Sequence, residues 1–204
     1  ICASNSNNIL TDFLNTGTYD RNRKFYTTMS PSMDILISSN LERLLFFIAG
    51  AEKTAGYMKA LNEKGVYSVE KDVLEVIKSE FSAYYCCEEE CAATIKSIFD
   101  KYSYLCDTHT AVAIKAAHLY LQENGKGRKN IVASTASPYK FAADVLTSLG
   151  KDVPENIEKV LSYLSEVSNT PIPSPLANLF DKKVRFTKSV QKEHNSLLCE
   201  VLSF

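Results

Sequence analysis

Residues 1–17 of the chain read ICASNSNNILTDFLNTG, and this stretch decides the fold class. Its first three residues are typical of a buried strand, whereas residues 8–16 place apolar side chains at helical spacing. Small polar residues separate the two segments, and Gly17 stands where a left-handed backbone conformation commonly ends a helix. A strand that leads through a polar turn directly into a helix is the repeating unit of α/β proteins.

The rest of the chain continues this pattern with many helices and few strands. Helical spacing, with glycine after several segments, predicts helices at residues 8–16, 40–49, 51–64, 67–80, 92–99, 110–121, 138–149, 157–167 and 190–202. Short strands are expected at residues 1–3, 35–38, 82–86, 104–106 and 130–134. We therefore expect a helix-rich α/β fold with a short, mostly parallel sheet flanked by helices.

Two parts are expected along the chain. Residues 1–168 carry the strand and helix pattern, whereas residues 169–204 begin with a proline-rich connector and end in a tail helix. The chain opens on Ile1, in what reads as the middle of a strand, and the predicted sheet is thin for so many helices. We therefore expect residues 1–168 to be the later part of a domain whose upstream half is absent.

The composition excludes several classes of protein. Lys and Arg number 23 against 24 Asp and Glu, so there is no basic excess for binding nucleic acid. The longest apolar run, residues 44–51, is far shorter than the roughly 20 residues of a membrane span. Six cysteines with no C-x-x-C and no zinc-like spacing favour reduced thiols, a cytoplasmic location and no metal site. The chain also lacks G-x-G-x-x-G, P-loop, G-x-S-x-G and H-E-x-x-H motifs.

Polar turns that follow strands are the expected places for chemistry, because ligands of open α/β sheets gather at the carboxyl ends of strands. In the first turn, residues 4–8, Asn5 offers an amide beside the N–H groups of a helix start. Capping and an Asx turn would explain the same residues without a ligand. In the second turn, His109 is either a proton carrier or phosphate donor, or is packed beside capping by Asp107 or Thr108.

A third turn covers residues 134–141. It places Thr135 at the carboxyl end of a predicted strand with a free hydroxyl. Lys140 either reaches an anion at the start of the following helix or lies in solvent.

A fourth segment, residues 30–43, brings the carboxylate of Asp34 and the guanidinium of Arg43 close to serine hydroxyl groups. Arg43 can hold a phosphate group through two parallel hydrogen bonds. It can equally pair with Asp34 or Glu42, and the spacing does not distinguish these alternatives.

Taken together, these segments resemble the C-terminal half of the threonine synthase family, which comprises pyridoxal-phosphate enzymes of the tryptophan-synthase-β type (fold type II). The resemblance runs from Ile1 to about Val160 in the family's order and spacing. One departure is Thr108, where the family pattern has proline before the histidine. The matching stretches are residues 3–7, 11–13, 16–20, 30–35, 38–44, 107–113 and 134–141.

The resemblance implies conversion of O-phosphohomoserine and water into threonine and phosphate, with pyridoxal 5'-phosphate as the electron sink. It implies a hydroxyl at the cofactor's pyridine nitrogen, from Thr135 or, second, Ser134, and a contact of Asn5 with the cofactor or substrate edge. The Schiff-base lysine and the phosphate-binding loop belong to the family's upstream half. Residues 1–168 are then the C-terminal part of the catalytic domain, inactive without that half.

On the substrate side, the resemblance implies that Arg43 meets the leaving phosphate. The other implied substrate contacts are Asn40, Asp34, Ser32, His109 and Lys140. The expected partners are the small-molecule substrate and the missing N-terminal half, with no nucleic acid, membrane or metal ion.

Two other functions remain open from the sequence. A sister enzyme of the same type would act as a lyase on another phosphorylated amino acid. A non-catalytic α/β module would keep the fold, and it predicts that Thr135, Asn5 and His109 do not converge.

Overall fold

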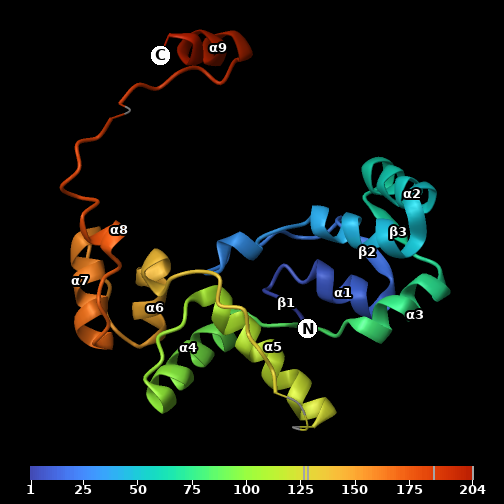
Figure 1. Cartoon of the computed structure of the whole chain (residues 1–204), viewed down its shortest axis with the longest axis horizontal. Coiled ribbons are helices and arrows are strands. Elements are labelled where there is room, and N and C mark those ends of the chain that lie inside the picture. Colours follow the sequence, from blue (N-terminus) through green and yellow to red (C-terminus); the bar gives the residue numbers. More distant parts are fainter. Residues whose placement is uncertain (126, 128, 186, 204) are drawn as a thin grey trace. The chain divides into compact units, whose positions relative to one another are not determined.

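A computed structural model describes residues 1–125, 127, 129–185 and 187–203 of the chain (Figure 1). The chain divides into two compact units, Ile1–Pro171 and Ile172–Phe204. In the second unit, the short helices α8 (Ser174–Ala177) and α9 (His194–Leu202) contain no buried residue. The first unit carries every segment in which we expect chemistry.

The first unit is helix-rich with very short strands. Its strands are β1 (Cys2–Ser4), β2 (Thr18–Asp20), β3 (Val66–Ser68) and β4 (Ala83–Tyr85). Its α-helices are α1 (Ile9–Thr16), α2 (Ser39–Lys64), α3 (Lys71–Glu80), α4 (Glu88–Tyr102), α5 (Thr108–Asn124), α6 (Ala142–Ser148) and α7 (Ile157–Ser168). Two 3₁₀ turns, η1 (Pro31–Met33) and η2 (Pro138–Phe141), complete it. The expected helix-rich α/β class is confirmed.

The sheets differ from the expectation in detail. β1 pairs with β4 in parallel, and β2 pairs with β3 antiparallel, so the described chain has two separate pairs where we expected one mostly parallel sheet. Residues 35–38, 104–106 and 130–134 are not strands. A strand exists only as part of a hydrogen-bonded ladder, and these segments have no ladder partner among the described residues. The sequence does not predict β2 and β3, because a strand of three residues is too short to show the alternation of apolar and polar side chains.

Glycine ends or bends the helices where the sequence indicates. Gly17 and Gly65 follow α1 and α2 with φ of 78° and 75°, in the left-handed region. Gly50, with φ of 82° and ψ of 171°, interrupts the helical dihedrals inside α2 and divides it into two halves. The N-cap of α2 is Ser38, whose hydroxyl accepts a hydrogen bond from the Leu41 N–H at 3.3 Å.

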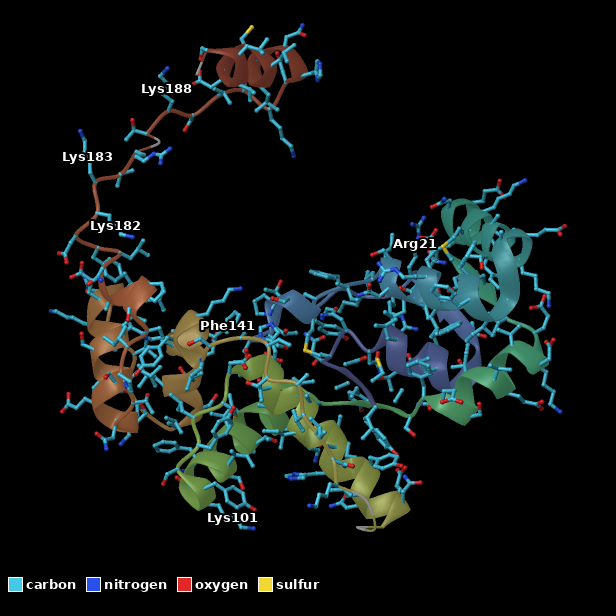
Figure 2. All side chains as sticks on the ribbon, viewed as in Figure 1. Arg21, Lys101, Phe141, Lys182, Lys183 and Lys188 are labelled. Atoms are coloured by element: carbon cyan, nitrogen blue, oxygen red, sulfur yellow. The ribbon has the colours of Figure 1, made fainter. Side chains whose placement is uncertain are left out.

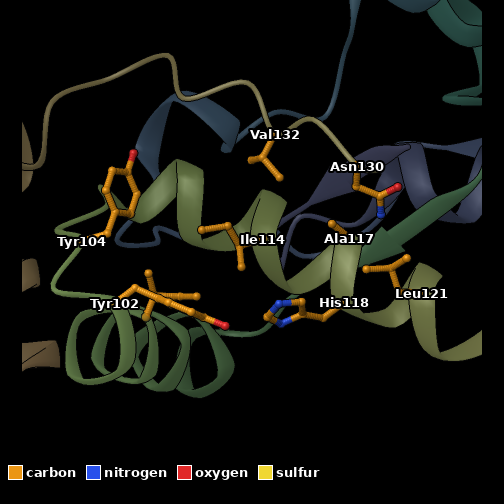
Figure 3. Close-up of a pocket in the computed structure, with 9 residues that line it drawn as sticks. Tyr102, Tyr104, Ile114, Ala117, His118, Leu121, Asn130 and Val132 are labelled. Carbon is orange, nitrogen blue, oxygen red and sulfur yellow. The ribbon is translucent and has the colours of Figure 1, made fainter. Parts of the chain in front are cut away.

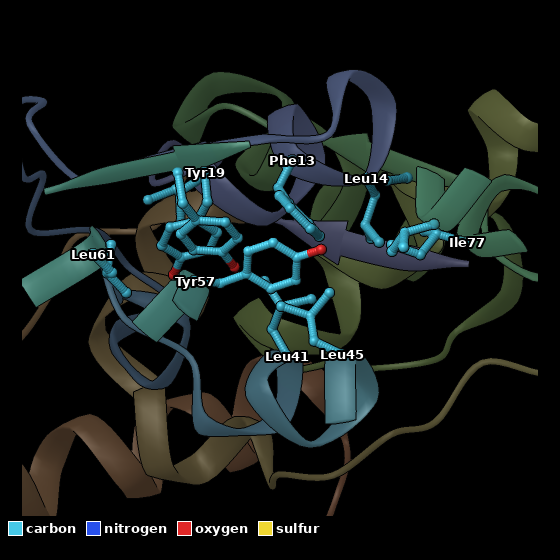
Figure 4. Close-up of a cluster of buried hydrophobic side chains, with 12 residues drawn as sticks. Phe13, Leu14, Tyr19, Leu41, Leu45, Tyr57, Leu61 and Ile77 are labelled. Atoms are coloured by element: carbon cyan, nitrogen blue, oxygen red, sulfur yellow. The ribbon is translucent and has the colours of Figure 1, made fainter. Parts of the chain in front are cut away.

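An aromatic cluster forms the centre of the core between α1, α2 and the β2–β3 pair (Figure 4). The Tyr67 ring stacks between Tyr19 and Tyr57, with centroids 5.4 Å apart on each side. Phe13 packs against the Tyr19 ring edge to face at 5.8 Å. Burial raises the pKa of Tyr19 to about 12, so its hydroxyl stays neutral and hydrogen-bonded to the Leu36 carbonyl at 3.1 Å. This cluster fixes α2 against the strand pair.

α4 and α5 pack side by side and carry the second half of the first unit (Figure 1). Their contact faces and those of α6 and α7 bury Ile95, Val112, Leu146 and Leu164 completely or almost completely. No helix in the described part of the chain has the length and hydrophobicity that crossing a membrane requires.

Gly65 is expected to tolerate no side chain. A Cβ at this position would lie 2.2 Å from Asn22 Oδ1, and the backbone has φ of +75°. Gly65→Ala should lower the free energy of unfolding by at least ~1 kcal/mol, because alanine is strained in this conformation and because Asn22 must release the Lys64 carbonyl. Urea denaturation measures this.

Gly56→Ala is the matched control. It lies within α2, and no atom lies within 4 Å of the added Cβ, so it should raise stability by about 0.5–1 kcal/mol. Equal effects of the two substitutions would contradict the argument from conformation.

Candidate functional site

Asn5 lies at the carboxyl end of β1 and is fully buried. Its side-chain Nδ2 lies 2.8 Å from Thr28 Oγ1, 3.0 Å from Ser30 Oγ and 2.7 Å from Asp34 Oδ1. Its Oδ1 accepts a hydrogen bond from the Asn7 N–H at 2.9 Å, which makes an Asx turn. The amide therefore joins the turn after β1 to residues 28–34, and its polar atoms are engaged within the protein.

The carboxylate of Asp34 completes this cluster. Besides Asn5, it accepts hydrogen bonds from Asn7 Nδ2 at 2.9 Å and from the Thr28 hydroxyl and N–H at 2.7 and 3.0 Å. A part-buried carboxylate with this many donors orders the loop around it. Two residues expected to contact ligand thus lie together and bind each other.

His109 connects that loop to the start of α5. Asp107 caps the helix and accepts a hydrogen bond from the His109 N–H at 2.9 Å. The His109 ring then bridges two segments, with Nδ1 3.0 Å from Asp107 Oδ1 and Nε2 accepting from the Ser32 N–H at 3.1 Å. Because Nε2 accepts, the ring proton lies on Nδ1 and points to the carboxylate. Capping by Asp107, one of the two alternatives from the sequence, is what the structure contains, and the ring packs against Phe141 (labelled in Figure 2) at 4.6 Å.

The connection extends to the third turn. The Thr110 hydroxyl donates a hydrogen bond to Asp107 Oδ2 and lies 3.1 Å from Ser134 Oγ. We call these linked residues the inter-segment network; its members are Asn5, Asn7, Thr28, Ser30, Ser32, Asp34, Asp107, His109, Thr110 and Ser134. The network brings together four segments that are far apart in the sequence.

Four of the expected ligand contacts lie at exposed positions and are not members of this network. Thr135, Lys140, Asn40 and Arg43 are all exposed. Within the described residues no side-chain hydrogen bond involves Thr135, and no carboxylate pairs with Arg43. The possible pairing of Arg43 with Asp34 or Glu42 is therefore wrong. The Lys140 ammonium lies 5.4 Å from the centre of the Phe141 ring.

Five residues of the network were not expected as site residues from the sequence, namely Asn7, Thr28, Ser30, Asp107 and Thr110. Thr28 belongs to no recognisable motif, and only its distance to Asn5 and Asp34 reveals its part. Asp107 was expected only as a cap, because the hydrogen bond that extends its link to Ser32 joins His109 to a residue 77 positions away and leaves no local signal in the sequence.

The buried thiols near the network are not expected to react as nucleophiles. Burial, with a smaller effect of the Asp107 charge, raises the pKa of Cys106 to about 11. A hydrogen bond with Cys86, together with burial, raises the pKa of Cys91 as well. These thiols stay protonated at neutral pH and act as small apolar groups. In the described ranges no three His, Cys, Asp or Glu residues are grouped so as to hold a metal ion.

Comparison with solved structures defines the class: the fold is that of a fold-type-II enzyme dependent on pyridoxal phosphate. The PLP-bound threonine synthase from Brucella melitensis matches with a TM-score of 0.74 and 36% identity, over 91% of this chain and 36% of that one. Yeast threonine synthase matches with a TM-score of 0.76 and 33% identity, over 89% of this chain and 37% of that one.

Sequence comparison finds similarity to the same family. A family model described as "Threonine synthase, C-terminal" matches residues 110–197. Threonine synthase of Saccharomyces cerevisiae is 37% identical over 183 residues (78% of this chain), and human threonine synthase-like 1 is 38% identical over 175 residues (84% of this chain). The chain spans 36% and 23% of the lengths of these two relatives. The resemblance to the C-terminal part of the threonine synthases is therefore confirmed.

Asp107 is expected to be the most sensitive polar residue of the site. Asp107 accepts hydrogen bonds from the N–H groups of His109 and Thr110 and from the His109 ring. Asp107→Ala would leave these donors buried without an acceptor, so it should lower the free energy of unfolding by about 2–4 kcal/mol. The control is Asn156→Ala, which removes the exposed N-cap of α7 and should cost about 1 kcal/mol. Chemical denaturation of both variants compares them, and an Asp107→Ala effect no larger than the control would contradict a central role.

Proposed function

We propose that this chain is the C-terminal part of a threonine synthase, which converts O-phosphohomoserine and water into threonine and inorganic phosphate. The observation that carries the proposal is the inter-segment network, because it joins residues from four of the seven stretches that match the family. The non-catalytic alternative predicts that Asn5, His109 and Thr135 do not converge. Asn5 and His109 instead belong to one network, which also includes Ser134, the neighbour of Thr135 in the sequence.

The residues present fit pyridoxal 5'-phosphate, which would supply an electron sink for carbanions at Cα and Cβ of the substrate. Thr135 offers an exposed hydroxyl that no described group engages, and this suits the pyridine nitrogen. A hydroxyl, unlike a carboxylate, does not hold that nitrogen protonated, so the sink is a mild one. Ser134, tied to Thr110, positions the turn that carries Thr135.

The substrate side is assigned to exposed cations and amides. Arg43 and Asn40 lie three residues apart on α2, so they share one face of the helix, where Arg43 would bind the phosphate of the substrate. Lys140 is a second exposed cation, and the Ser32 side chain is exposed on η1. We assign Asp34, Asn5 and His109 to positioning, because their polar atoms already bind other parts of the network.

A sister lyase for another phosphorylated amino acid is the second candidate. This candidate is supported by human threonine synthase-like 1, which is named as similar to threonine synthase and not as threonine synthase itself. Its identity to this chain is 38%, against 37% for the yeast threonine synthase. Phosphate release measured with O-phosphohomoserine and with O-phosphoserine on the same full-length protein separates the two functions.

The chain alone is expected to be inactive. The resemblance implies that the lysine that would hold the cofactor covalently lies in the upstream half of the family, which this chain does not include. Purified chain should release no phosphate from O-phosphohomoserine and should show no visible absorbance band that borohydride removes. Turnover by the isolated chain would overturn this assignment of the lysine.

Arg43→Ala in the full-length protein should raise KM for O-phosphohomoserine about 10- to 100-fold, because a charge-assisted hydrogen bond to the phosphate is lost. Lys59→Ala is the control, since this lysine is 74% exposed and lies on the second half of α2, beyond the break at Gly50. Steady-state kinetics on both variants gives the comparison. An unchanged kcat/KM for Arg43→Ala would remove this residue from the substrate site.

A further inference from the structure

Every backbone N–H group of residues 28–34 is engaged in a hydrogen bond, although the segment contains only one short 3₁₀ turn. Pro31 has no N–H group. Four of the N–H groups bond to acceptors within the segment; the donors are Thr28, Ser30, Met33 and Asp34. The N–H groups of Met29 and Ser32 bond to side chains that lie far away in the sequence. The conformation of the segment therefore depends on those two side chains.

Those two side chains belong to the starts of two neighbouring helices. Glu88 is the first residue of α4, and its Oε2 accepts a hydrogen bond from the Met29 N–H at 2.8 Å. His109, the second residue of α5, accepts a hydrogen bond from the Ser32 N–H at 3.1 Å. Because α4 and α5 pack side by side, residues 29–32 are held at both ends by one packed pair of helices.

Three consecutive glutamates open α4, and they have different surroundings. Glu90 lies 3.0 Å from the Lys115 ammonium, and the two residues line a small hollow together with His118. Figure 3 shows His118 among the side chains of a neighbouring hollow of about 450 Å³ along α5. Glu89 is exposed, and its carboxylate bonds at the start of α4 itself. Glu88 is the glutamate that reaches the segment at residues 28–34.

The helix dipole does not explain this contact. Carboxylates in the first turn of a helix are stabilised by the dipole whatever they contact, and this applies equally to Glu88, Glu89 and Glu90. Of the three, Glu88 is hydrogen-bonded to a residue 59 positions away in the sequence. A hydrogen bond from a backbone N–H to a carboxylate is roughly twice as strong as one between neutral groups. The carboxylate of Glu88 therefore fixes the position of Met29.

We propose that Glu88 is a positioning residue of the substrate site. Its carboxylate holds the Met29 end of residues 29–32 while His109 holds the Ser32 end, and the exposed Ser32 hydroxyl is thereby kept in place for the substrate. Glu88 itself does not contact the substrate. An ordered segment lowers the entropy cost of binding, so the expected effect is on affinity. The inference rests on the proposed function, which assigns Ser32 to the substrate side.

Hydrogen exchange on the chain itself tests the contact. In Glu88→Ala the amides of Met29 and Ser32 should exchange about tenfold faster, because one end of the segment is released. Glu88→Gln keeps a carbonyl acceptor and should restore slow exchange. Glu89→Ala is the matched control, since it removes a carboxylate from the same helical turn, and exchange at Met29 should not change. Equal exchange at Met29 in Glu88→Ala and Glu89→Ala overturns the proposal.

Steady-state kinetics on the full-length protein tests the role in substrate binding. Glu88→Ala should raise KM for O-phosphohomoserine about fivefold to tenfold and leave kcat within about twofold, because a loosened segment weakens ground-state and transition-state binding alike. Glu88→Gln should restore KM, and Glu89→Ala should leave both constants unchanged. An unchanged KM in Glu88→Ala, or a loss confined to kcat, overturns the proposal. If Glu88→Ala does not fold, Glu88→Asp takes its place with the same expectations, because the shorter side chain draws the carboxylate away from Met29.

The two proposals can fail separately. Absence of O-phosphohomoserine turnover by the wild-type full-length protein overturns the proposed function, whatever the exchange at Met29. Turnover by the wild type, with the same Met29 exchange and the same KM in Glu88→Ala, overturns the role of Glu88 alone.

Discussion

The buried carboxylate of Asp107 is the constraint on which the polar half of the molecule depends. A charge without access to water is stable only where donors surround it. Here the donors are the N–H groups of His109 and Thr110, the Thr110 hydroxyl and the His109 ring. His109 then holds Ser32, and Thr110 holds Ser134. The positions of two distant segments thus follow from the solvation of a single charge.

Buried and exposed polar residues have different tasks in this arrangement. Asn5 and Asp34 hydrogen-bond to each other and to Thr28, so they determine the conformation of the turn. Arg43 and Thr135 remain exposed, and no described ion pair or side-chain hydrogen bond engages them. In the function we propose, the buried groups fix the geometry of the turn, and the exposed side chains of Arg43 and Thr135 would lose their bound water only when a ligand binds.

Local features of the fold could be predicted from the sequence, and non-local ones could not. Helix ends at Gly17 and Gly65 follow from backbone conformation alone. Residues 130–134 have the composition of a strand, but strand formation depends on a neighbour that composition does not specify. The same limit applies to the site: the motif around Asn5 was visible, whereas its partnership with Thr28, 23 residues later, was not.

The break at Gly50 gives the two halves of α2 a degree of independence. With φ of 82° and ψ of 171°, a conformation open essentially to glycine only, it uncouples the rotation of the two halves about their axes. Leu41 and Leu45 anchor the first half in the core, while Tyr57 and Leu61 anchor the second. The half that bears Arg43 can therefore change its orientation with little disturbance of the aromatic stack, and in the function we propose such a change would move the side chain that binds the phosphate.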